Sequence, residues 1–131
     1  MIECLIVGDS IAYGVSNIRK ECVAYAKSGI NSSDWNDKYR TKITDSKITI
    51  ISLGTNDVKQ LNTEVELVAL RSRIRVGRVF WIMPPIKPEK QQIVRNIAKA
   101  YGDSIIKITE LSTDKIHPTY NGYKKLGELA R

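Results

Sequence analysis

Three side chains in this sequence could together perform nucleophilic catalysis. Ser10 follows Gly8-Asp9, the chain's one histidine is His117, and Asp114 lies three residues before that histidine. A serine hydroxyl becomes a nucleophile when an adjacent base takes its proton, and a carboxylate can orient a histidine base. Taken alone, Ser10 is typical of a helix N-cap and a lone histidine of a surface residue. The catalytic interpretation therefore depends on neighbouring residues.

Two further loops carry residues suited to stabilising an oxyanion. Asn56 lies in Gly54-Thr55-Asn56-Asp57, and its amide is an uncharged donor of the kind that meets developing negative charge. Gly29 lies in Ser28-Gly29-Ile30-Asn31, which has the composition of an ordinary turn. Asp9 and Asp57 are interpreted as structural carboxylates that hydrogen-bond the backbone of their loops.

Short runs rich in Ile and Val alternate along the chain with segments of helical period. Strands are predicted at residues Glu3 to Val7, Cys22 to Ala26, Lys47 to Leu53, Arg78 to Met83 and Ser104 to Ile108. Helices are expected after Ser10 and after Ser33, and apolar spacing marks three more, around Leu61 to Ile74, Ile93 to Tyr101 and Tyr123 to Ala130.

This alternation predicts an α/β fold, a three-layer α/β/α sandwich around a five-stranded parallel sheet. The common order for five such strands is 2-1-3-4-5, as in flavodoxin, with ligands beyond the carboxyl ends of the strands. That order places the Ser10, Gly29 and Asn56 loops side by side. Because no segment has the composition of a linker, residues 1–131 are expected to form a single domain.

Gly8-Asp9-Ser10, Gly29, Gly54-Thr55-Asn56-Asp57 and Asp114-x-x-His117-Pro118 occur in an order that resembles the SGNH hydrolases, the GDSL esterase/lipase family. The resemblance spans residues 8 to about 126, with Ile11 in place of the usual leucine. It implies that Ser10 attacks a carbonyl carbon, that His117 accepts the proton and that Asp114 orients His117. It also implies an oxyanion hole made from the backbone N–H groups of Ser10 and Gly29 and the side chain of Asn56.

The histidine loop is long enough to reach the serine. Strands one and five would lie three positions apart, roughly 14 Å at the usual strand spacing. The segment from Thr109 to His117 can extend to about 30 Å, so geometry permits the triad.

Composition limits the partners. The formal net charge of +7 favours anionic ligands, but the cluster Arg71, Arg73, Arg75 and Arg78 is interpreted as a solvated helix face, and nucleic-acid binding is not favoured.

Cys4 and Cys22 are predicted to be free thiols in buried strands, unless those strands are neighbours whose side chains converge. No metal or cofactor is expected. The N-terminus lacks a basic leader and no apolar run could span a bilayer, so we expect a cytoplasmic protein, or one released without a signal peptide.

The sequence thus predicts a serine esterase, or acyl hydrolase, that cleaves small acyl esters, chiefly acetyl esters, with a glycan or an anionic small molecule as candidate carrier. The stiff Pro84 to Pro88 loop is a candidate wall of the acyl pocket. Alternatives are a lysophospholipase or thioesterase, an FMN or nucleotide-phosphate binder on the same fold, a phosphoacceptor domain, and a non-catalytic flavodoxin-like binding module derived from a hydrolase.

Overall fold

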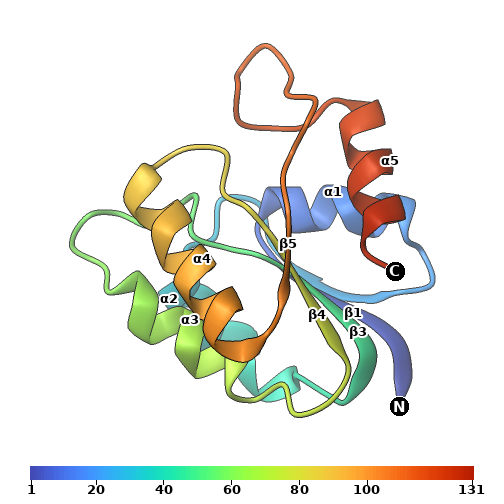
Figure 1. The fold of residues 1–131 in the computed structure, drawn as a ribbon, viewed down its shortest axis with the longest axis vertical. Coiled ribbons are helices and arrows are strands. Elements are labelled where there is room, and N and C mark those ends of the chain that lie inside the picture. Colours follow the sequence, from blue (N-terminus) through green and yellow to red (C-terminus); the bar gives the residue numbers. More distant parts are fainter.

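The computed structural model describes residues 1–131 as five strands alternating with five helices (Figure 1). The strands are β1 (Ile2–Gly8), β2 (Val23–Ala26), β3 (Ser46–Ser52), β4 (Arg78–Ile82) and β5 (Ser104–Ile106). The helices are α1 (Ser10–Ile18), α2 (Ser32–Tyr39), α3 (Thr63–Arg71), α4 (Pro88–Tyr101) and α5 (Tyr120–Leu129), with a short 3₁₀ turn at Arg40–Lys42. No helix is both long enough and apolar enough to cross a membrane.

All five strands are parallel, in the order β2-β1-β3-β4-β5. Gly8 at the end of β1 lies beside Ala26 on one side and Ser52 on the other. The carboxyl ends of three strands therefore meet at one edge of the sheet, and the loops that follow them are neighbours. This confirms the predicted fold class and strand order.

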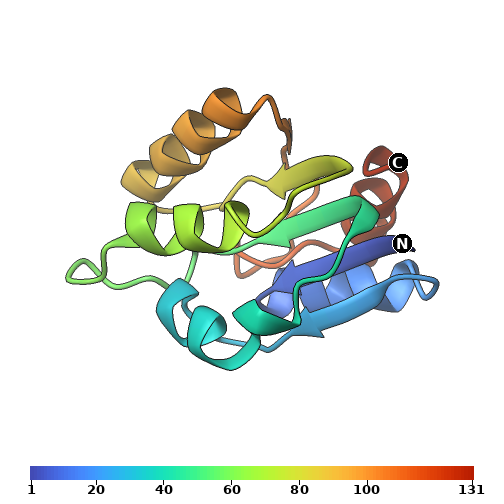
Figure 2. The ribbon, with the colours of Figure 1, turned by 90° about the horizontal axis from the view of Figure 1, so that it is seen from below.

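Alternation along the central strands divides the apolar side chains between two cores. Leu5 and Val7 of β1 face a core closed by α2, α3 and α4, whereas Ile6 faces a core closed by α1 and α5. Figures 1 and 2 show the two groups of helices on opposite sides of the sheet. Burial of both faces explains the near-continuous Ile and Val runs of the central strands.

Several helices begin at side chains that accept hydrogen bonds from otherwise unpaired backbone N–H groups. Asp9, Asn31, Asn62 and Thr119 cap α1, α2, α3 and α5 in this way. Helix α4 instead begins at Pro88, whose fixed φ suits the first turn. Ser10 is thus the first residue of α1, and its neighbour Asp9, not Ser10, is the cap.

The predicted element boundaries differ from the structure mainly at strand ends. Leu53, Met83 and the last two residues of the predicted segment 104–108 lie beyond the strands, in the loops that build the site. β2 begins at Val23 and is a partly exposed edge strand, with Val23 40 % exposed. The prediction of a buried strand here was wrong, because β2 pairs with β1 alone and has no neighbouring strand on its other edge.

The prediction of two free thiols was also wrong: Cys4 and Cys22 form a disulfide. The register pairs Leu5 with Val23, so Cys4 lies opposite the residue immediately before β2. Their Cα atoms are 4.7 Å apart, within the range that a disulfide spans.

Arg71 is not part of a solvated helix face. Its side chain is buried and donates two hydrogen bonds to the Asp103 carboxylate, at 2.7 and 2.9 Å, and one to the Ile74 carbonyl. Trp81 donates to the same carboxylate. The arginine closes the corner between α3 and the end of α4, whereas Arg73, Arg75 and Arg78 remain exposed.

Candidate active site

The turn that carries Ser10 is fixed by hydrogen bonds to the end of β3. Asp9 accepts from the N–H of Ile11 at 3.0 Å and from the Ser52 hydroxyl at 3.0 Å, while its own N–H donates to the Ser52 carbonyl. Gly8 has a positive φ of 146°, and a Cβ there would overlap the Ser52 carbonyl oxygen. Only glycine fits this close approach, so the turn and its serine have a single position.

Ser10, His117 and Asp114 form a continuous hydrogen-bonded chain. Ser10 Oγ is 2.9 Å from His117 Nε2, and His117 Nδ1 is 2.6 Å from Asp114 Oδ2. The three residues that the sequence predicts to work together are therefore brought together, in the predicted order.

Asp114 is held by its own loop. Its Oδ1 accepts from the N–H groups of Ile116 and His117, each at 2.9 Å, and from the Ser112 hydroxyl at 2.8 Å. The hydrogen bond from His117, followed by these backbone and hydroxyl donors, lowers the pKa of Asp114 well below its usual range. The carboxylate is thus charged at any ordinary pH and can orient and stabilise a protonated imidazole.

The histidine loop crosses back from β5 to α5 over the carboxyl edge of the sheet, as the orange segment of Figure 1 shows. Leu111 pairs with Pro118 in an isolated antiparallel bridge, and the Ser112 N–H donates to the His117 carbonyl at 2.8 Å. Lys115 at the tip has a φ of 60°, which is uncommon for a residue with a side chain. These contacts fix the position of His117 above Ser10.

Asn56 and the Gly29 loop are joined directly. The Asn56 side-chain amide donates to the Ile30 carbonyl at 3.1 Å, and an amide has a second N–H. Gly29 is exposed with a φ of 76°. The candidate oxyanion donors thus lie on two loops in contact, beside the end of β1.

Asp57 connects the Asn56 loop to the residues that follow the Gly29 loop. Its buried carboxylate accepts from the Ser32 N–H at 2.8 Å, from the Ser32 hydroxyl at 2.5 Å and from the Thr63 hydroxyl at 2.7 Å. These hydrogen bonds fit the structural role predicted for Asp57. They also connect α2 and α3, which follow the Gly29 and Asn56 loops.

Asp9 is a second carboxyl group close to Ser10 but in a different environment. Burial raises its pKa to about 6, against the opposing effect of the Ser52 hydroxyl and the helix N–H groups. Its second oxygen, Oδ2, is buried without a hydrogen-bond partner. Nearby Tyr123 has a raised pKa too, from its burial first and then from the charges of Asp9 and Asp114.

Some residues around the site gave no signal in the sequence. Lys87, in the left-handed region at a φ of 66°, donates from Nζ to the Asp57 carbonyl at 2.9 Å. In the sequence, Ser52 looks like any other strand residue. Ser32 and Thr63 look like any other polar residues near the start of a helix. Only the shared strand edge could have suggested that they meet.

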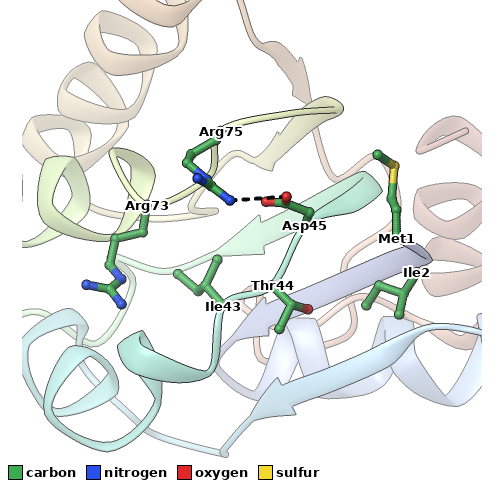
Figure 3. A pocket seen from close by; sticks show the side chains of 7 residues that line it. All are labelled: Met1, Ile2, Ile43, Thr44, Asp45, Arg73 and Arg75. Atoms are coloured by element: carbon green, nitrogen blue, oxygen red, sulfur yellow. Dashed lines mark hydrogen bonds and ion pairs between the residues drawn. The ribbon is translucent and has the colours of Figure 1, made fainter.

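The largest hollow of the molecule does not contain the candidate triad. A cavity of about 700 Å³ lies at the amino ends of the strands, and Figure 3 shows Arg75 and Asp45 paired on its wall. Ser10 lies beyond the carboxyl end of β1, at the opposite edge of the sheet. This cavity contains no histidine, and its one carboxylate, Asp45, is paired with Arg75, so the smaller site around Ser10 is the better catalytic candidate.

Two smaller hollows lie at the carboxyl edge on either side of the triad. One, of about 310 Å³, is lined by residues 27–30 with Asp34 and Lys38, and so includes Gly29. The other, of about 260 Å³, lies between the loop after β4, helix α4 and the start of the histidine loop. The triad itself opens onto the surface between them.

One cluster of potential metal ligands was found, formed by Cys4, Glu21 and Cys22. Its two sulfur atoms are joined to each other, so neither is a thiolate available to a metal ion. The cluster also lies far along β1 from Ser10.

The fold defines the class of protein: a three-layer α/β/α sandwich with a parallel sheet in flavodoxin-like order and polar residues gathered at the carboxyl edge. A crystal structure from Bacteroides fragilis NCTC 9343, of a protein provisionally described as an acylhydrolase, has the same fold with a TM-score of 0.71. The alignment covers 97 % of this chain and 83 % of that one at 16 % sequence identity, so it establishes the shared fold. No family model and no curated protein sequence matches this chain.

Proposed function

We propose that this protein is a serine esterase of the SGNH hydrolase type that cleaves small acyl esters. The observation that carries the proposal is the hydrogen-bonded chain from Ser10 Oγ through His117 to Asp114. The structural similarity to a protein provisionally described as an acylhydrolase supports the same class of reaction.

In the first half of the reaction, Ser10 Oγ attacks the ester carbonyl carbon while His117 Nε2 takes the hydroxyl proton. The negative charge moves to the carbonyl oxygen, where the N–H groups of Ser10 and Gly29 and the free amide N–H of Asn56 would donate to it. Asp114 stabilises the protonated imidazole through Nδ1. The carbon–oxygen bond to the alcohol then breaks, and His117 gives its proton to the departing oxygen.

In the second half, a water molecule attacks the acyl-serine carbonyl carbon. His117 takes a proton from that water, the same donors meet the oxyanion, and collapse releases the carboxylic acid with the proton returned to Ser10 Oγ. No atom outside the chain, the ester and water is needed to balance these steps.

The open position of the triad favours small acyl groups. No cavity with room for a long acyl chain surrounds Ser10; the two nearby hollows measure about 260 and 310 Å³. An acetyl group needs no deep pocket, and an exposed triad admits a bulky alcohol such as a glycan. Acetyl esters of small or carbohydrate alcohols are therefore the proposed substrates.

The proposal is tested with a short-chain aryl ester. Ser10→Ala should lower kcat by about 10⁶ while its circular dichroism and urea unfolding match those of the unaltered chain. Asn56→Ala should lower kcat by about 10²–10³, the usual effect of losing one oxyanion donor. Mass spectrometry after treatment with a fluorophosphonate should place one covalent adduct on Ser10.

Ser16→Ala is the matched control, because Ser16 lies on the same helix but donates only to the Tyr13 carbonyl. It should keep full activity and labelling. Full turnover in Ser10→Ala would remove the nucleophile assignment. A folded protein that neither hydrolyses the ester nor takes up the fluorophosphonate would favour a non-catalytic binding module.

A further inference from the structure

The hollow beside the histidine loop combines apolar walls with positive charge. Its apolar lining is Met83, Pro84, Pro85, Ile108 and Leu111, and its polar lining is Gln91, Arg95 and Lys107. We propose that this hollow is the subsite for the leaving alcohol, and that it selects alcohols carrying an anionic group on a small apolar body. This inference rests on the proposed esterase function.

Its position follows from the path of the proton. The departing oxygen must reach His117 Nε2, so the alcohol lies on the side of the active site where the histidine loop lies. Leu111, on the wall of the hollow, pairs with Pro118, the residue after His117. The Ser112 N–H donates to the His117 carbonyl at 2.8 Å. The hollow is therefore built into the same loop that holds the base.

The charge of the lining has one sign. Arg95 and Lys107 are both exposed, and no carboxylate lines the hollow. Arg95 donates only to Gln92 Oε1, at 3.3 Å, and Lys107 is in no ion pair. Both cations are thus free to meet an anion. By contrast, the hollow beside Gly29 sets Asp34 against Lys27 and Lys38.

The walls favour a compact apolar body. Met83 and Pro84 are buried, Leu111 is 38 % exposed, and Gln91 fixes the loop by donating to the Pro84 carbonyl at 2.8 Å. Pockets for drug-sized ligands measure about 300–1,000 Å³. A hollow of about 260 Å³ therefore suits one ring or a short chain, with the carboxylate, sulfate or phosphate at the rim.

Two pairs of esters, each with one anionic and one neutral member, test whether a negative charge on the alcohol is recognised. 4-Acetoxybenzoate carries its anion on the alcohol, and 4-acetoxybenzamide is its neutral counterpart. Phenyl hemisuccinate carries its anion on the acyl group, and phenyl butyrate is its neutral counterpart. For each pair we would measure the ratio of kcat/KM, anionic over neutral, for the unaltered chain and for Arg95→Gln/Lys107→Gln.

The ratio for the acetoxy pair should fall about fivefold in the double variant, the scale of two exposed ion contacts. Its value in the unaltered chain should also fall with added salt, because salt screens such contacts. The hemisuccinate ratio and the rates for both neutral esters should not change. Lys20→Gln/Lys99→Gln removes the same charge from two exposed positions, one just after α1 and one in the last turn of α4, and should change neither ratio.

A binding measurement distinguishes the proposed alcohol subsite from the proposed esterase function. The amide NMR signals of Arg95, Ile108 and Leu111 should shift with 4-hydroxybenzoate, the alcohol product, and the same shifts should need about fivefold more 4-hydroxybenzamide. Binding without turnover would leave the subsite standing and overturn the esterase. Turnover of both acetoxy esters with an unchanged ratio in Arg95→Gln/Lys107→Gln would overturn the subsite, and a fall confined to the hemisuccinate ratio would reassign the hollow to the acyl group.

Discussion

Two carboxyl groups lie next to the Ser10–His117 pair, and their surroundings drive them to opposite behaviour. Asp114 is exposed and receives hydrogen bonds from His117 and from loop donors, which lower its pKa. Asp9 is buried, which raises its pKa to about 6. Carboxyl groups whose pKa values are pushed apart in this way take different roles. Asp114 is the permanent charge beside His117, and Asp9 is the cap that fixes the serine turn.

The raised pKa of Asp9 makes stability depend on pH. The carboxyl group binds a proton more readily in the folded chain, at about 6, than at its ordinary value of 3.8. Its contribution to the free energy of unfolding is therefore full below about pH 4 and is lost as the pH rises through about 6. The shift corresponds to about 3 kcal/mol. Asp9→Asn removes this titration, so its stability relative to the unaltered chain should rise by about that amount between about pH 4 and pH 7.

Urea unfolding of both proteins at matched pH values measures this difference, and every other titrating group is common to the two chains. Asp34→Asn, an exposed carboxyl on α2, serves as the control and should follow the unaltered chain. Curves for Asp9→Asn and the unaltered chain that stay parallel across this range would show that folding does not shift the pKa of Asp9.

At the scale of elements, the distance between α1 and α5 depends on Gly14. A Cβ at Gly14 would overlap the ring of Tyr123, which is half-buried on α5. Ser10 lies one turn before Gly14 on α1, and His117 lies just before α5. The packing of these two helices therefore sets the separation of the candidate nucleophile and its base.

Gly14→Ala should lower both the free energy of unfolding and kcat, although alanine is the better helix former by about 1 kcal/mol. Overpacking of this kind costs about 1–3 kcal/mol. Tyr123→Leu removes the overlapping ring atoms, so Gly14→Ala/Tyr123→Leu should regain most of the stability that Gly14→Ala loses. Urea unfolding and kcat for the two single variants and the double variant complete a mutant cycle, and strictly additive effects would contradict the proposed contact.

For the whole molecule, the parallel sheet and its order were predictable because strand and helix periods alternate five times and few topologies accept that pattern. Ser10 and Asn56 could be predicted to lie close together because they follow adjacent strands, β1 and β3. Asp114 and His117 follow β5 at the far edge of the sheet, and they could be placed near Ser10 only because their loop is long enough to reach it. What could not be predicted depended on register and packing between distant segments. Neither the Cys4–Cys22 disulfide nor the burial of Arg71 against Asp103 has a local signature, since each needs two segments aligned to within one residue.

The disulfide makes the stability of the whole domain sensitive to reductant. Cys4 and Cys22 are 18 residues apart, and closing a loop of that length stabilises the folded chain by about 3 kcal/mol in the chain-entropy model. The bond joins β1 to the edge strand near the sheet's amino ends, away from Ser10. Urea unfolding with and without dithiothreitol should show this difference, while activity measured well below the unfolding transition stays unchanged. Cys4→Ala/Cys22→Ala should unfold identically with and without reductant, and an unaltered chain equally stable in both conditions would mean that the two thiols are not joined in solution.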